Sequence, residues 1–126
     1  MAGVKTFRDL IAWRLGMDLA RSDYRATAKM PEDERFGLTI QLRRAAVSAP
    51  SNIAEGFGRE RRPEMLRFLR ISRGSLSEVS TQYELACSMG MIEPSRELLD
   101  LIAETDRVLQ GLIRSLGRPA PAQPSG

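Results

Sequence analysis

Apolar residues recur at alternating steps of three and four positions along four stretches of this 126-residue chain. That spacing places them on one face of an α-helix, because the helix turns through about 100° per residue. The expected helices cover about residues 7–28, 32–57, 63–89 and 94–116. No stretch competes as a strand, so the pattern predicts an all-α protein.

The same spacing predicts which residues form the core. The expected core positions are Leu10, Trp13, Met17, Ala20 and Tyr24; Leu38, Leu42, Ala45, Ala46, Ala49, Ile53 and Phe57; Leu69, Ser72, Leu76, Val79, Tyr83 and Ala86; and Leu98, Ile102, Thr105, Leu109, Leu112 and Leu116. A second, smaller apolar edge on residues 32–57, formed by Ile40, Val47 and Ala54, indicates that this helix is covered on two sides.

Residues that start and stop helices lie between the four stretches. Thr6 and Asp9 form a plausible capping pair before the first helix, and the acidic run 32–34 suits the start of the second. Gly56 and Gly58 offer left-handed positions at the end of the second helix. Short connections of this kind favour antiparallel neighbours in an up-down-up-down four-helix bundle.

One bundle domain is expected over residues 1–117, followed by a disordered, proline-rich tail over 118–126. Pro50 lies inside the second predicted helix, where it removes a backbone donor and clashes with the preceding turn. We expect a kink there and not a break, because a break would separate Ile53 and Phe57 from the apolar face that continues from Leu42.

The second helix also carries a narrow polar stripe that we call the polar seam. On a helical projection its members fall within roughly 80° of one another. They are Gln41, Arg44, Ser48, Asn52 and Glu55, with Arg59 at the end of the stripe. The seam is either a solvated face or a polar network that sets the register of the bundle or a subunit contact, and the apolar surface on both sides favours the network.

Positive charge is unevenly distributed along the chain. The net charge is +3, but residues 43–73 hold eight arginines and three acidic residues. The candidate phosphate-binding residues are Arg43, Arg59, Arg61, Arg62, Arg67, Arg70 and Arg73. The alternative is an ordinary solvated face. Phe57 and Phe68 occupy core positions, so base stacking is not expected and binding should be mainly electrostatic.

Other classes of protein are disfavoured. The chain has no histidine, one cysteine, no phosphate-binding glycine loop and no cluster with metal-ligand spacing, so we expect no enzyme activity, cofactor or metal. No apolar run is long enough to span a membrane, and the first residues lack the apolar stretch of a signal peptide. The expected location is the cytoplasm.

Four ordered motifs carry a family resemblance. They are Phe7-x-x-Leu10-x-x-Trp13, Pro31-x-x-Glu34-x-Phe36-Gly37-Leu38-x-x-Gln41-x-Arg43-Arg44-Ala45, Ser48-x-Pro50-Ser51-Asn52-Ile53-Ala54-Glu55-Gly56-Phe57, and Phe68-Leu69-x-x-Ser72-x-Gly74-Ser75-Leu76-x-Glu78. The chain resembles the four-helix-bundle proteins encoded in intervening sequences of bacterial 23S ribosomal RNA genes. One departure is Ala49, where the family more often has a larger aliphatic residue.

The resemblance implies a homopentamer of four-helix bundles. A related branch includes the accessory variability protein of diversity-generating retroelements, which is understood to bind a reverse transcriptase and nucleic acid through a basic surface. The motif positions to carry over are Arg43, Arg44, Asn52, Glu55 and Arg59, none with an agreed family role. The favoured hypothesis is therefore a non-enzymatic homo-oligomer that contacts RNA, DNA or a nucleoprotein such as the ribosome. The alternative is an adaptor for a polymerase or reverse transcriptase without nucleic-acid binding of its own.

Overall fold

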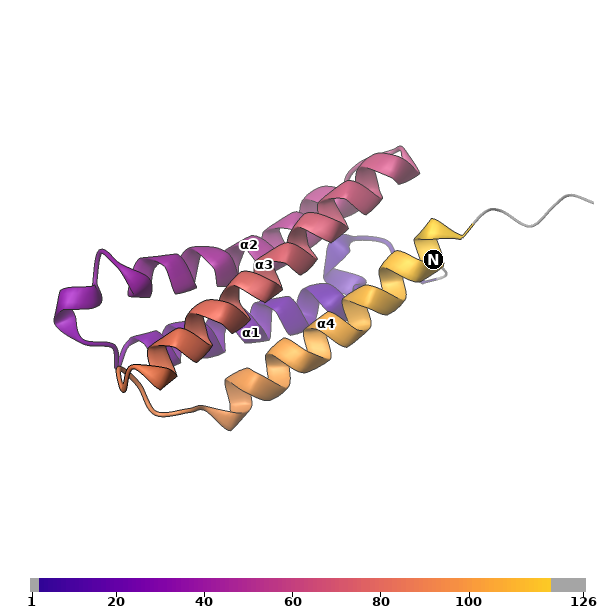
Figure 1. Cartoon of the computed structure of the whole chain (residues 1–126). Coiled ribbons are helices and arrows are strands. Elements are labelled where there is room, and N and C mark those ends of the chain that lie inside the picture. The colour runs from indigo at the N-terminus through magenta and orange to yellow at the C-terminus, as the bar shows by residue number, and fades with distance from the viewer. Residues whose placement is uncertain (1–2, 119–126) are drawn as a thin grey trace, which may run out of the picture.

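The computed structural model describes residues 3–118 (Figure 1). In chain order, its elements are the 3-10 helix η1 (Phe7–Asp9), α1 (Ile11–Thr27), the 3-10 helix η2 (Glu32–Glu34), α2 (Leu38–Phe57), α3 (Arg62–Ser88) and α4 (Arg96–Gly117). These residues hold four α-helices and no strand, which confirms the predicted all-α four-helix fold class. Apart from Arg118, the predicted tail over 118–126 lies outside the described residues.

Each long helix packs against two others, so the four form one bundle in which the chain runs back and forth (Figure 1). α2 lies between α1 and α3, and α4 lies between α3 and α1. Gly56, late in α2, approaches Met65, early in α3. Ser48, a little over two turns earlier in α2, bonds Ser75, almost three turns later in α3. These two helices therefore run in opposite directions.

The first predicted helix is divided in two. Thr6 accepts a hydrogen bond from the backbone of the first turn while Asp9 accepts one from Thr6 N–H, so the predicted capping pair is confirmed. The turn that it starts is the short η1, because Leu10 adopts an extended conformation and α1 begins only at Ile11. The capping signal was correct, but it belongs to a separate 3-10 turn.

The acidic run 32–34 also forms a separate turn, η2, and α2 begins only at Leu38. Leu38 N–H donates a 3.0 Å hydrogen bond to Glu34 Oε2, so one of the acids still caps α2 from outside the helix. A Cβ on residue 37 would lie 2.7 Å from the same Glu34 oxygen. Gly37 therefore leaves room for the cap, and its backbone conformation separates η2 from α2.

The expectation of left-handed glycines at the end of α2 was wrong. Gly58 has a φ of −77°, and Gly56 is a buried position within α2. A Cβ at Gly56 would lie 3.1 Å from both Met65 O and Phe68 Cβ, so this glycine allows α2 and α3 to approach closely. Among the residues described here, the left-handed helix end is Gly90, where Met91 N–H bonds Ala86 O across the end of α3.

The buried face of α1 differs from the predicted one. Its buried positions are Ala12, Gly16, Leu19, Ser22, Asp23 and Thr27. Tyr24, which we expected in the core, is 45% exposed, and Trp13 and Met17 are only half buried. The prediction followed the larger apolar side chains, whereas small and polar residues face the bundle interior.

Close packing explains why α1 turns this face inward. A Cβ at Gly16 would lie 3.2 Å from Pro50 Cβ, so the absence of a side chain at Gly16 allows α1 to pack closely against Pro50 of α2. α2 continues through Pro50 as one helix from Leu38 to Phe57, as predicted. The expected kink at Pro50 stays a prediction.

The other three helices bury most of the residues that the spacing predicted. All six predicted core positions of α3 are buried, and α2 buries Leu42, Ala45, Ala46, Ala49 and Ile53. In α4, Leu98, Thr105 and Leu109 are buried, while the remaining predicted positions are half buried against the core. The bundle thus holds α2 and α3 side by side, with the turn between them at one end.

Candidate nucleic-acid interface

Four of the seven candidate arginines gather where α2 ends and α3 begins. Only four residues separate Phe57 at the end of α2 from Arg62 at the start of α3. We call the group of Arg59, Arg61, Arg62 and Arg67 the arginine turn. All four residues are exposed. Pro63 occupies the start of α3, where its missing N–H costs no helical hydrogen bond.

An aromatic ring orients two members of the arginine turn. The guanidinium carbon of Arg59 lies 4.7 Å from the centroid of the Phe68 ring, and that of Arg67 lies 5.4 Å from it. Phe68 itself is half buried at the close contact with Gly56. Because cations are attracted to the face of an aromatic ring, the packed ring holds both guanidiniums near one place on the surface.

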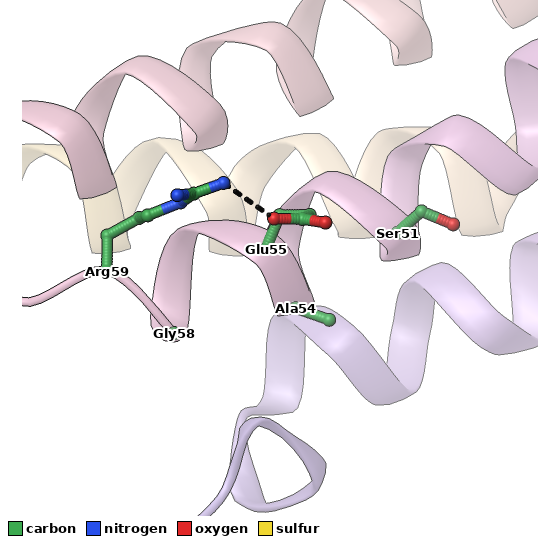
Figure 2. A pocket seen from close by; sticks show the side chains of 5 residues that line it. All are labelled: Ser51, Ala54, Glu55, Gly58 and Arg59. Carbon is green, nitrogen blue, oxygen red and sulfur yellow. Dashed lines mark hydrogen bonds and ion pairs between the residues drawn. The ribbon is translucent and has the colours of Figure 1, made fainter.

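The candidate arginines differ in how far their charge is neutralised. Arg59 forms a 2.9 Å ion pair with Glu55, which Figure 2 shows beside Ser51, and Arg73 forms a 3.1 Å ion pair with Asp106 of α4. Arg62 donates a 3.1 Å hydrogen bond to the backbone carbonyl of Arg118.

The remaining three candidates on this surface have no ion-pair partner in the described part of the chain. Within residues 3–118, Arg61, Arg67 and Arg70 have no acidic partner within ion-pair distance. These are the charges most available to an external anion. Arg70 and Arg73 also border a surface hollow of about 490 Å³ on α3.

Arg43 lies apart from the arginine turn. It is half buried near the start of α2, where its guanidinium lies 4.6 Å from the centroid of the Tyr24 ring. Its Nε–H donates a 2.9 Å hydrogen bond to Thr27 Oγ1 on α1. The prediction grouped Arg43 with the other arginines by sequence, but the structure places it at the opposite end of α2.

The polar seam divides into two groups. Ser48 Oγ and Ser75 Oγ are 2.8 Å apart across the α2–α3 interface, and Asn52 Nδ2 donates 2.9 Å bonds to the Ser48 hydroxyl and carbonyl. Ser72 Oγ adds a 2.7 Å bond to the carbonyl of Ala49. These bonds fix how α2 and α3 lie against each other, so this half of the seam is a network within the protein.

The other members of the seam face outward. Glu55 forms its ion pair with Arg59 and does not contact Asn52 by a hydrogen bond. Glu55 and Arg59 line an open hollow of about 630 Å³, shown in Figure 2. Gln41 and Arg44 are exposed, and in the described part of the chain neither makes a side-chain hydrogen bond. The predicted network therefore does not extend along the whole stripe.

A buried polar group on α1 escaped the sequence analysis. Asp23 is fully buried, and neither oxygen of its carboxylate has a hydrogen-bond partner in the described structure. Burial raises the pKa of this carboxyl from 3.8 to about 7, although the nearby Arg43 guanidinium favours the charged form. The hydroxyl of Thr39 on α2 is also buried and unpaired. Its burial could have been inferred from spacing, since Asp23 lies four residues after Leu19 and four before Thr27 and therefore shares their face of the helix.

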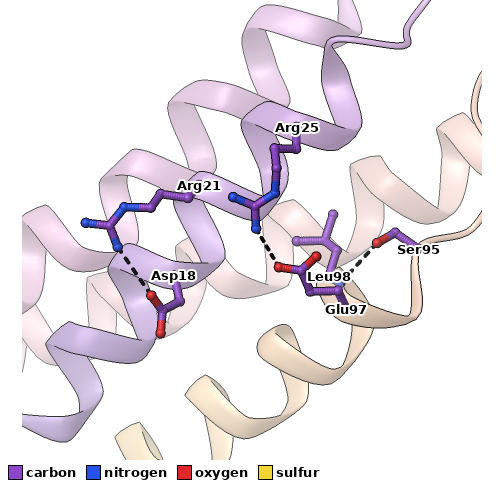
Figure 3. A network of polar contacts seen from close by, with 6 residues as sticks. All are labelled: Asp18, Arg21, Arg25, Ser95, Glu97 and Leu98. Carbon is purple, nitrogen blue, oxygen red and sulfur yellow. Dashed lines mark hydrogen bonds and ion pairs between the residues drawn. The ribbon is translucent and has the colours of Figure 1, made fainter.

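The face formed by α1 and α4 has a different electrostatic character. Arg21 pairs with Asp18 at 3.2 Å and Arg25 with Glu97 at 2.5 Å, as Figure 3 shows. Ser95 caps α4 by accepting a hydrogen bond from Leu98 N–H. Arg21 and Arg25 are thus each neutralised by an acidic side chain, in contrast to Arg61 and Arg67 of the arginine turn.

Residues 3–118 contain no group of three histidine, cysteine, aspartate or glutamate side chains placed to hold a metal ion. They also contain no helix with the length and apolar character needed to cross a bilayer.

The fold and the arginine turn together define a small helical bundle with a basic end. The family model described as 23S rRNA-intervening sequence protein matches residues 8–113. The chain therefore belongs to the family of 23S rRNA-intervening sequence proteins.

A solved structure shares the fold. It is a protein of unknown function from the S23 ribosomal protein family of Bacteroides thetaiotaomicron, with a TM-score of 0.61 and 16% sequence identity over 84% of this chain and 94% of that chain. At this identity the likeness shows the fold alone. No functionally curated protein matches the chain. The relation to accessory variability proteins of retroelements stays a prediction.

Proposed function

We propose that this protein is a non-enzymatic, cytoplasmic homo-oligomer whose arginine turn contacts the phosphate backbone of RNA or DNA. The observation that supports the proposal most is the concentration of guanidiniums at the α2–α3 turn, where Arg59 alone of the four has an ion-pair partner in the described residues. Unpaired guanidiniums bind phosphate through planar, charge-assisted hydrogen bonds. The name of the family connects its genes with ribosomal RNA, which makes RNA the first ligand to test.

The geometry of the turn suits an extended polyanion better than a small anion. Arg61 and Arg62 lie at the start of α3, and Arg67 and Arg70 follow within the next two turns along its exposed side. A helix rises 1.5 Å per residue, so these exposed charges are distributed over roughly 12 Å along the helix axis. The phosphates of a polyanion can contact charges spread in this way without any readout of sequence.

Assembly would multiply this surface. A homopentamer, as the resemblance implies, would repeat the arginine turn around its axis and raise avidity without a strong single site. Exposed apolar side chains supply surface that subunit contacts can bury; Ile11 is 64% exposed and Met89 62%. Under this proposal Ser48 and Asn52 of the polar seam hold α2 against α3 so that the turn keeps its shape.

The salt dependence of binding tests the proposal. The double variant Arg61→Gln/Arg67→Gln removes two unpaired charges from exposed positions, so the fold should persist. We expect weaker binding to every RNA and DNA sequence, and a salt slope lower by about one for each lost phosphate contact. Fluorescence polarisation across a salt series measures both quantities.

A matched control distinguishes the surface from net charge. Arg21→Gln/Arg96→Gln removes the same charge from α1 and α4 and should leave the slope near that of the unmodified protein. Equal slopes for both double variants would contradict the proposed surface. Absence of binding by the unmodified protein, together with capture of a polymerase or reverse transcriptase, would favour the adaptor alternative.

A further inference from the structure

A second hollow of about 490 Å³ lies at the opposite end of α2 from the arginine turn, between α1 and α2. Its size falls within the range of small-molecule sites. Four apolar side chains line it: Tyr24, Phe36, Ile40 and Val47. Phe36 is 80% exposed and Tyr24 45%, an unusual exposure for aromatic residues in a small bundle. We call this hollow the aromatic pocket.

Arginines surround the aromatic pocket. Arg35, Arg43 and Arg44 line it, and no acidic residue among the described ones does. The guanidinium carbon of Arg35 lies 4.7 Å from the Phe36 ring centroid, and Arg43 lies at 4.6 Å from that of Tyr24. Arg35 is paired with Glu32 at 2.9 Å, whereas Arg43 and Arg44 have no acidic partner in the described structure. The pocket therefore combines flat apolar surfaces with two guanidiniums available to an anion.

We infer that the aromatic pocket binds one unpaired nucleotide of a single-stranded nucleic acid. The base stacks on Phe36 or Tyr24, and a phosphate contacts Arg43 and Arg44. Bases stack on both aromatic rings and guanidinium planes, and this pocket offers both. The inference rests on the proposed function and adds to it a preference for single strands, which the arginine turn alone does not provide.

The inference also revises the expectation that base stacking is absent. That expectation considered Phe57 and Phe68, which are half buried. It placed Tyr24 in the core and did not consider Phe36, and these two are the exposed rings. An acidic peptide with an apolar anchor is the competing occupant, but two exposed aromatic rings beside two guanidiniums without an ion-pair partner in the described structure match a nucleotide more closely.

Phe36→Ala tests the inference because Phe36 is exposed and its removal should not impair folding. We expect this variant to bind a single-stranded oligonucleotide about tenfold more weakly, since stacking accounts for one to two orders of magnitude in affinity per base. Its affinity for a duplex of the same length should not change. Leu85→Ala removes an exposed apolar side chain elsewhere, 48% exposed against 80% for Phe36, and should match the unmodified protein on both ligands. An oligonucleotide carrying 4-thiouridine should cross-link to a peptide containing Tyr24 or Phe36.

Three outcomes would contradict the inference. If Phe36→Ala binds the single strand as tightly as the unmodified protein does, the aromatic pocket is not a nucleotide site. The proposed function would still stand if Arg61→Gln/Arg67→Gln lost affinity in the same assay. If the unmodified protein binds neither ligand, both proposals fail. If an acidic, tryptophan-containing peptide binds in a Phe36-dependent manner and the oligonucleotide does not, the pocket is a protein-docking surface.

Discussion

The two interfaces of α2 differ in how completely their buried polar groups are hydrogen-bonded. Against α3, the hydroxyls of Ser48, Ser72 and Ser75 all have partners between 2.7 and 2.8 Å away. Against α1, the carboxylate of Asp23 and the hydroxyl of Thr39 are buried without a hydrogen bond in the described structure. Both interfaces combine small residues with close helix approach, at Gly56 in the first and at Gly16 in the second.

The hydrogen-bonded groups of the α2–α3 interface stabilise the fold, whereas the unpaired groups of the α1–α2 interface destabilise it. A satisfied network of short side chains fixes the register of two helices and lowers the free energy of the folded state modestly. A buried, unpaired carboxylate raises that free energy, because ionisation is penalised in an apolar surrounding. The α2–α3 interface therefore holds the arginine turn in place, while the α1–α2 end retains polar groups that destabilise the isolated chain.

Asp23→Asn should produce the largest effect. The folded-state pKa of about 7 exceeds the ordinary 3.8, so between these pH values the folded protein binds more protons at this carboxyl than the unfolded chain does. The unfolding free energy then falls as pH rises, by about 1.4 kcal/mol per pH unit and on the order of 4 kcal/mol in total. The stability that the protonated Asp23 carboxyl contributes is fully lost above about pH 7.

Urea unfolding at pH 4 to 8 measures this effect. Asp23→Asn should flatten the pH dependence and raise the unfolding free energy at pH 8 relative to the unmodified protein. Asp33→Asn, an exposed position in η2, is the control and should leave the curve unchanged. Parallel curves for the unmodified protein and Asp23→Asn would show that this carboxyl has an ordinary pKa in the folded state.

Ser72→Ala should have the next largest effect. The substitution removes the 2.7 Å bond from Ser72 Oγ to the Ala49 carbonyl at a fully buried position. We expect a loss of about 1 kcal/mol in unfolding free energy, measured by urea unfolding. Ser77→Ala, on the exposed side of α3, should change it little. Equal losses in the two variants would deny the network its structural role.

Thr39→Val should have the smallest effect on the unfolding free energy, and any change should be an increase, in contrast to Ser72→Ala. Valine keeps the shape of threonine and removes a hydroxyl that has no partner in the described structure. The unfolding free energy should stay the same or rise by up to about 1 kcal/mol. A loss as large as that of Ser72→Ala would mean that the Thr39 hydroxyl is satisfied in solution, and the contrast between the two interfaces would disappear.

Much of the fold could be predicted from sequence because α3 and α4 carry regular apolar spacing. Leu76, Val79 and Leu109 lie where that spacing placed them. α1 could not be predicted as well, since its interior positions include Gly16 and Asp23, which carry no apolar signal. Helix starts were misplaced where glycine or an extended residue divides a 3-10 turn from an α-helix, as at Gly37.

The candidate site was only partly predictable. The arginine turn follows from sequence, because Arg59, Arg61 and Arg62 are consecutive or nearly so. The separate position of Arg43 depends on how α1 packs against α2, which spacing does not specify. The exposure of Phe36 likewise depends on the turn between η2 and α2. Aromatic residues are usually assigned to the core, and for that reason the aromatic pocket was not predicted.

Native mass spectrometry of the purified protein at low salt tests the central claim, that the arginine turn binds nucleic acid in an assembled protein. We predict a homo-oligomer that carries co-purifying nucleic acid, releases it at high salt, and loses it in Arg61→Gln/Arg67→Gln without dissociating into monomers. A monomer free of nucleic acid at low salt would contradict both the assembly and the binding surface.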